Sequence, residues 1–251
     1  MLNQKHRYFI EFSFVGTNYH GWQIQKNAHS VQAELNAALS VIFQEEVATI
    51  GAGRTDTGVH AKQFFAHFDV KDGITTPDQQ VFQLNCILPK DIAVRRMISV
   101  HEDAHARFDA TSRTYEYVIT QKKDPFMQDF ACFLYGKLDI DKMNVAAKTL
   151  TNYTDFSAFS KSRTQVKNFD CDLHFAEWKR DADDHLVFTI TANRFLRNMV
   201  RAIVGTLVDI GQGKQDMEDL HRIIEGKKRS AAGESMPACG LYLVDIKYPF
   251  L

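Results

Sequence analysis

Two hydrophobic periodicities alternate along this chain, and their order limits the folds that it can adopt. Residues 6–14 are an aromatic and β-branched run that predicts a strand. After a loop, Ser30 can cap a helix whose apolar residues recur at helical spacing from Val31 to Phe43. The same reasoning predicts strands over 47–50, 62–70, 92–100 and 114–120, and a helix over 76–88 that Thr76-Pro77 opens.

The second half of the chain repeats this mixture of elements. Its periodicities predict helices over 142–150, 195–210 and 217–224, and strands over 172–178, 186–191 and 241–248. Strands and helices mixed without strict βαβ alternation are typical of the α+β class. We place a boundary near residue 110, which gives an α+β half over residues 1–110 and a second α+β half over 111–251.

Composition excludes several classes of protein. The four cysteines are widely spaced without a CxxC pair, so they indicate neither a disulfide framework nor a zinc knuckle. This cysteine usage fits a reducing cytoplasm. No uncharged stretch is long enough to span a bilayer and no apolar signal core opens the chain, so we expect a protein that is neither exported nor membrane-spanning. Because the formal net charge is -1, any nucleic-acid site must be a local basic patch.

Residues 51–60 read Gly-Ala-Gly-Arg-Thr-Asp-Thr-Gly-Val-His, which places an arginine and an aspartate in a glycine-bracketed loop. A Walker A loop is excluded because, four spacer residues after Gly53, the chain has Gly58-Val59 where Gly-Lys followed by Ser/Thr would be needed. A dinucleotide-binding fingerprint is excluded because its third glycine would fall on Asp56, whose carboxylate would repel pyrophosphate. The plain alternative is a tight turn in which Asp56 caps backbone amides.

The string over residues 53–61 closely resembles GRTDAGVHA, the signature of the tRNA pseudouridine synthases that act at positions 38 to 40, and differs only at Thr57. Other segments resemble this family in the right order, so the resemblance covers nearly the whole chain. Val15 and Met236 are further departures from the family pattern. The matching segments are Gly21-Trp22-Gln23, 85–89 with 91–95, His105-Ala106-Arg107-Phe108, Tyr115-Glu116-Tyr117, 199–205 and Pro237-Ala238-Cys239-Gly240-Leu241.

The resemblance implies an enzyme that isomerises uridine to pseudouridine in the anticodon stem-loop of tRNA. The bond from ribose C1′ to uracil N1 breaks and C1′ joins C5, so nothing is oxidised or hydrolysed and no cofactor or metal is needed. The resemblance also implies two ferredoxin-like halves around a central antiparallel sheet, with the catalytic cleft between them. It further implies a homodimer that clasps tRNA.

By resemblance, Asp56 is the catalytic carboxylate. It could attack C1′, add to the base, or abstract a proton on the way to a glycal, and the sequence does not choose among these routes. A carboxylate in a dry pocket needs a positive partner to stay ionised. Arg201 is the candidate, because the predicted helix places it on one face with Arg194 and Arg197. The alternative is a solvated arginine stripe.

Five further residues are predicted to bind the substrate. Arg54 resembles the signature arginine that grips the RNA backbone and helps to extract the target nucleotide, although it could simply pair with a nearby acid. Tyr115 would stack on the extracted uracil, although tyrosines on strands more often pack across the sheet. His60, Arg107 and Phe108 are the other candidates. Phosphates outside the site could meet Lys161, Arg163, Lys167, Lys227, Lys228 and Arg229.

Two other functions compete with this one. Residues 101–105, His-Glu-Asp-Ala-His, formally match the HExxH motif of zinc proteases. However, the segment follows a β-rich run, and Phe108 and Thr111 occupy the places of the glycine and third histidine in the extended motif. A catalytically silent RNA-binding module is the other alternative, and the retention of all the proposed catalytic groups argues against it.

Overall fold

The computed structural model describes residues 5–162 and 167–251. The chain divides into two compact units, of which unit 1 comprises the residues up to Thr111 together with Leu243–Leu251, and unit 2 comprises Ser112–Tyr242. Both units combine helices with largely antiparallel strands, as the predicted α+β class requires. Within the described ranges, no helix has the length and apolarity needed to cross a membrane.

Unit 1 is built on an antiparallel sheet with the strand order β4-β1-β3 and a short strand, β2, on β3. These strands are β1 (His6–Phe14), β2 (Ile50–Gly51), β3 (His60–Val70) and β4 (Ile92–Ser99). The strand predicted over 47–50 is displaced and only two residues long. The backbone just before this strand forms hydrogen bonds with side chains instead of with another strand. Val47 N–H donates to Ser40 Oγ, and Thr49 N–H donates to Asn36 Oδ1.

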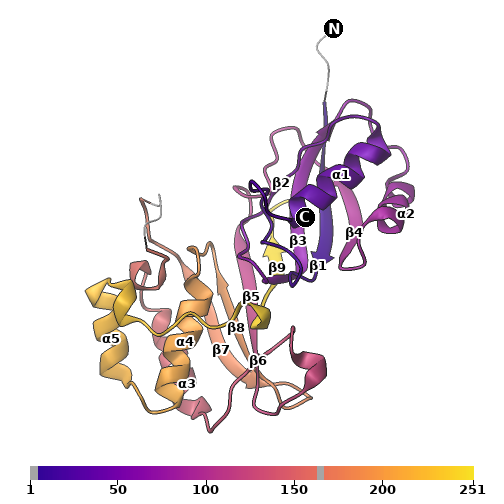
Figure 1. Ribbon diagram of the computed structural model, residues 1–251. Helices are drawn as coiled ribbons and strands as arrows, with labels where there is room; N and C mark the ends of the chain where they lie inside the picture. The colour runs from indigo at the N-terminus through magenta and orange to yellow at the C-terminus, as the bar shows by residue number, and fades with distance from the viewer. Residues whose placement is uncertain (1–4, 163–166) are drawn as a thin grey trace. The chain divides into compact units, whose positions relative to one another are not determined.

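The two helices of unit 1 are α1 (Val31–Phe43) and α2 (Pro77–Ile87), both as predicted. Ser30 caps α1 through Oγ, which accepts the Ala33 N–H at 3.3 Å. Figure 1 shows α1 lying across the strands of this unit and α2 beside β4. The core between them is aromatic: Phe12, Phe64 and Trp22 pack together with centroids 4.8 to 5.6 Å apart.

The last strand, β9 (Leu241–Lys247), crosses the division between the units, and the nine residues from Leu243 onward belong to unit 1. Tyr248 explains this assignment. Its ring packs edge-on against Phe9 and Phe65 at 5.1 and 5.2 Å, and its hydroxyl donates to Ala106 O at 2.5 Å. A boundary that leaves all of 111–251 in the second half therefore misplaces the C-terminal segment.

Unit 2 contains the antiparallel strands β5 (Ser112–Thr120), β8 (Leu186–Ala192) and β7 (Leu173–Arg180), in that order, with the short β6 (Cys132–Phe133) parallel to β5. Its helices are α3 (Ile140–Leu150), α4 (Met199–Gly211) and α5 (Met217–Gly226). Figure 1 shows the three helices grouped beside β7, and α3 packs on both β7 and α4. Among its described residues are four short 3-10 helices, at Pro125–Met127 (η1), Ser157–Phe159 (η2), Arg229–Ala231 (η3) and Ala238–Gly240 (η4).

Helix α4 begins four residues later than predicted. Asn198 adopts a left-handed conformation with φ of 67°, so regular helix can start only at Met199. Arg194 and Arg197 therefore precede the helix, and the predicted face of three arginines does not form on it. Arg201 alone of the three lies on α4.

Candidate active site

The glycine-bracketed loop lies between β2 and β3 in unit 1. Asp56 is half-buried in it, and its carbonyl oxygen accepts the Val59 N–H at 3.2 Å, which closes a turn around Gly58 at φ of 78°. Arg54 is exposed at the start of the loop and forms no ion pair with any residue that the structure describes. The loop thus presents one carboxylate and one cation within three residues.

A second loop, residues 15–23, braces the first through close backbone contacts. A Cβ on Gly16 would lie 2.0 Å from the Val59 carbonyl oxygen, so a side chain cannot be accommodated there. The contact continues at Trp22, whose N–H donates to Thr55 Oγ1 at 2.9 Å. The sequence marks Gly21-Trp22-Gln23 as a family-like segment, but residue spacing does not predict its position against the Asp56 loop.

Asp91 anchors the near end of the bracing loop. Its carboxylate accepts the Tyr19 hydroxyl at 2.5 Å and the Asn18 amide at 3.3 Å, and its carbonyl accepts the Val15 N–H at 2.9 Å. Burial, with the hydrogen bond to Asp91, raises the pKa of Tyr19. Val15 acts through its backbone here, so its departure from the family pattern leaves this anchor intact.

His60 lies behind the loop. Its side chain is 1% exposed, and Nδ1 accepts the Gly16 N–H at 3.1 Å, which requires an unprotonated Nδ1. In this arrangement the imidazole holds the two loops together. Thr57, by contrast, is exposed, so its replacement of alanine does not disturb the packing of the loop.

Arg107 and Phe108 form an exposed pair on another loop of unit 1. Phe108 is 74% exposed, and the Arg107 guanidinium carbon lies 5.6 Å from the centroid of its ring. The His105 ring lies against Phe108, with the two ring centroids 4.2 Å apart. An exposed aromatic ring with a cation above it can stack on an unpaired RNA base.

The HExxH match does not form a metal site of the protease type. Residues 101–105 are not helical, whereas the motif needs both histidines on one helix face. His105 Nδ1 also faces the chain, accepting the N–H groups of Arg107 and Phe108 at 3.1 and 3.3 Å. The metalloprotease alternative therefore loses its structural basis.

Tyr115 and Tyr117 occupy β5 in unit 2, and they have different environments. Tyr117 is fully buried, and its hydroxyl donates to Pro237 O at 2.8 Å. Tyr115 is half-buried, and its ring meets Phe195 edge-on at a centroid distance of 5.0 Å. Tyr117 therefore serves the core, and Tyr115 is the better candidate for contact with a base.

Arg201 is half-buried on α4 and is fixed to the chain that follows η3. Its Nε donates to Met236 O at 2.5 Å, while its own carbonyl accepts the Met236 N–H at 3.1 Å. Both contacts use the backbone of Met236, so they do not depend on the side chain at this position.

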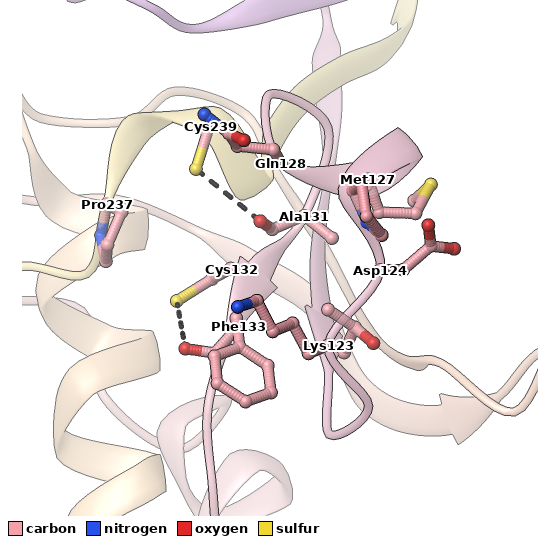
Figure 2. Close-up of a pocket in the computed structure, with 11 residues that line it drawn as sticks. Lys123, Asp124, Met127, Gln128, Ala131, Cys132, Phe133, Pro237 and Cys239 are labelled. Carbon is pink, nitrogen blue, oxygen red and sulfur yellow. Dashed lines mark hydrogen bonds between the residues drawn. The ribbon is translucent and has the colours of Figure 1, made fainter.

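A pocket of about 380 Å³ within unit 2 adjoins this segment. Figure 2 shows it between Pro237 and Cys239 on one side and the chain from Lys123 to Phe133 on the other. The Cys239 thiol is 3.6 Å from Ala131 O, and burial raises its pKa, so it is not an activated thiolate. The sequence marks Pro237 and Cys239 as part of a family-like segment, but it gives no sign that they line a pocket with residues 120–133.

The basic residues considered for phosphate contact differ in their surroundings. Lys227 pairs with Asp155 at 2.7 Å, and the guanidinium of Arg229 turns inward. Lys161, Lys167 and Lys228 are exposed, and Arg163 lies outside the described residues.

Comparison with known proteins places the chain in a family. A profile described as tRNA pseudouridine synthase matches residues 11–109 and 146–249, which include the Asp56 loop, α4 and β9. The chain belongs to the tRNA pseudouridine synthase family. Relatives named tRNA pseudouridine synthase A include one from Bacteroides thetaiotaomicron, 52% identical over 248 residues that cover 97% of this chain and 91% of the relative.

Two other members of the pseudouridine synthase family have the same name and similar coverage. The one from Bacteroides fragilis is 49% identical over 243 residues, covering 97% of this chain and 96% of its own length. The one from Bacillus pumilus is 36% identical over 240 residues, covering 94% and 96%. The similarity to these synthases thus extends through both units.

Proposed function

We propose that this protein isomerises uridine to pseudouridine at positions 38 to 40 in the anticodon stem-loop of tRNA, with Asp56 as the catalytic carboxylate. The observation that carries the proposal is the placement of Asp56 on a loop braced by the backbone of 15–23, next to the exposed Arg54. Membership in the tRNA pseudouridine synthase family supports the reaction class.

The reaction breaks the bond from C1′ to N1, forms a bond from C1′ to C5, and moves the C5 proton to solvent while N1 gains one. Each route for Asp56, whether as nucleophile or as base, needs an ionised carboxylate held at a fixed distance from the sugar and base. The glycine contacts beneath the loop restrict its backbone, which supports such a role.

Arg201 is proposed to supply the positive charge that keeps Asp56 ionised in the presence of substrate. The hydrogen bond from Nε to Met236 O favours this role, because it holds one edge of the guanidinium and so limits its orientations.

The residues proposed to contact the substrate are those whose side chains are exposed or half-buried. Arg54 would hold RNA phosphates, Tyr115 would stack on the extracted uracil, and Arg107 with Phe108 would meet an adjacent unpaired base. His60 would act on the substrate only through the loop that it supports.

We further propose that each unit is a ferredoxin-like half. The order β4-β1-β3-β2 in unit 1, with α1 and α2 as the connecting helices, supports this, as does the order β5-β8-β7 with α3 and α4 in unit 2. The protein is also proposed to be a cytoplasmic homodimer that works without cofactor or metal, because the isomerisation has no redox or hydrolytic step.

The test is single-turnover modification of an unmodified tRNA transcript, with pseudouridine mapped by position, in the presence of EDTA. A transcript with cytidine at positions 38 to 40 is the control. Pseudouridine at these positions alone, formed at the same rate with and without chelator, is expected. Tight tRNA binding without any pseudouridine would instead favour the silent RNA-binding module, and restoration of turnover only by added zinc would contradict metal independence.

A further inference from the structure

In unit 2, the chain over 233–236 lies directly on the backbone of α4. A Cβ on Gly205 would lie 1.9 Å from Glu234 O, and a Cβ on Gly233 would lie 2.6 Å from Thr206 N. Thr206 Oγ1 accepts the Gly233 N–H at 2.9 Å. Two glycines facing each other across one contact permit an approach that side chains would prevent.

The far end of this segment holds Arg201 through the two-way contact with Met236 described above. Its centre is held by Ser235, whose Oγ accepts hydrogen bonds from Arg229 Nη2 at 2.7 Å and Asn198 Nδ2 at 2.5 Å. Asn198 is the left-handed residue that starts α4, three residues before Arg201. Ser235 therefore links the start of the helix to the acceptor of the Arg201 Nε.

Arg229 donates three hydrogen bonds to residues 232–235. Its guanidinium donates to Ala232 O at 3.3 Å, Gly233 O at 3.0 Å and Ser235 Oγ at 2.7 Å. The group is half-buried, and burial lowers its pKa. All three acceptors are neutral, so the cation is partly removed from water without a carboxylate among these partners. The guanidinium of Arg229 carries its N–H donors in a fixed planar arrangement. It can therefore bind all three acceptors at once and fix their positions relative to one another.

We propose that Arg229 is a positioning residue for Arg201. By fixing Ser235 and the carbonyls before it, Arg229 sets the place of Met236 O and so the orientation of the Arg201 guanidinium. This inference rests on the proposed role of Arg201 in turnover. Loss of Arg229 would allow the segment to shift on α4, and displacement of a catalytic group by about 1 Å can lower a rate on the order of 100-fold.

The experiment compares the variants Arg229→Met, Arg229→Lys, Arg201→Met and the double variant, using single-turnover rates at saturating tRNA, tRNA dissociation constants and thermal melting. Arg229→Met should slow turnover by about 10- to 100-fold while the dissociation constant changes by less than about threefold. Arg229→Lys should rescue little, since one ammonium cannot span the three acceptors. The double variant should be no slower than Arg201→Met alone, because the two residues act on one step.

Arg222→Met is the matched control. Arg222 lies on α5 in the same unit, is exposed and pairs with Asp219, so its loss should leave the rate unchanged. Ser235→Ala is the second test variant, because it removes one hydroxyl that accepts two of the hydrogen bonds and is less disruptive to folding. It should slow the same step by about three- to tenfold, and it carries the test if Arg229→Met does not fold.

The outcomes separate the two proposals. If Arg201→Met slows turnover but Arg229→Met and Ser235→Ala are as fast as the wild type, the positioning role is wrong while the role of Arg201 stands. The positioning role would also be wrong if the rate losses of Arg201→Met and Arg229→Met multiplied in the double variant. Normal turnover by Arg201→Met would overturn the role of Arg201 itself.

Discussion

Gly21 lies so close to Thr55 that a Cβ on Gly21 would be 2.2 Å from the Thr55 carbonyl oxygen, although the residues are far apart in the chain. Gly21 also has φ of 85°, a conformation that glycine adopts at little cost and other residues adopt only with strain. The position of the Asp56 loop thus depends on a glycine that carries no chemistry. This dependence can be tested.

Gly21→Ala should displace the Asp56 loop. We expect a loss of about 1–3 kcal/mol in the free energy of unfolding and a larger relative loss of single-turnover rate, because the new methyl group collides with backbone rather than with a flexible side chain. Gly226→Ala is the control, since nothing lies within 4 Å of a Cβ at Gly226. Wild-type turnover by a folded Gly21→Ala protein would show that the contact does not set the active loop.

Arg54→Ala should impair turnover with little effect on stability. Arg54 is exposed and has no ion pair among the described residues, so its removal leaves no buried charge behind. The single-turnover rate should fall on the order of 100-fold, as for loss of a positioning contact, while tRNA affinity falls only a few-fold because other phosphate contacts remain. Arg95→Ala, which removes another exposed arginine of unit 1, is the control and should change neither the single-turnover rate nor the tRNA affinity. An unchanged rate for Arg54→Ala would remove this residue from the mechanism.

Protonation of His67 should lower the free energy of unfolding in mild acid. Burial lowers the pKa of this side chain to about 4, and its Nδ1 accepts the Ala106 N–H at 3.1 Å. Between the native pKa of about 4 and the unfolded value of 6.5, the unfolded chain binds more protons, so stability rises with pH across this window. The contribution is fully present above the unfolded pKa and is lost as pH falls toward 4, on the order of 3 kcal/mol in total.

The check is urea unfolding of the wild type and His67→Gln at several pH values from 4 to 7. Glutamine keeps an acceptor for Ala106 N–H but does not titrate, so the slope of stability against pH should be shallower in the variant. His105, whose pKa burial also lowers, contributes in the same direction and remains in both proteins. Identical slopes would contradict the assignment to His67.

The fold was predictable wherever local signals decide it. Helix α1 was predicted from the Ser30 cap and the apolar spacing behind it, and both are local. The strand predicted at 47–50 was nearly lost because Ser40 and Asn36, from the preceding helix, bind its backbone. The prediction that α4 starts at residue 195 was wrong because Asn198 has a left-handed conformation. No rule of residue spacing reveals this conformation.

The sequence predicts which residues form the candidate site, but not the backbone contacts that hold them in place. A nearly unbroken signature and a helical Met-Val-Arg match predict Asp56, Arg54 and Arg201, and their roles stay predictions. The contacts of Gly21 with Thr55, and of Met236 with Arg201, join segments 34 and 35 positions apart through backbone atoms. Hydrophobic periodicity carries no information on such pairings, which arise only when the chain is folded.

Asp56→Asn should abolish most of the catalysis while leaving the fold intact. The substitution preserves size and removes the negative charge, so the side chain can no longer attack C1′ or take a proton. Asn is also a good turn residue, and the Asp56 carbonyl that closes the turn onto Val59 is retained. We expect a melting temperature close to that of the wild type, tRNA affinity within a few-fold, and a single-turnover rate lower by at least about 1,000-fold, measured on one preparation. Thr57→Ala, which changes an exposed neighbour on the same loop, is the control and should modify tRNA normally. If Asp56 only capped the turn, asparagine would replace it without loss, so near-normal pseudouridine formation by Asp56→Asn would remove the carboxylate from the chemistry.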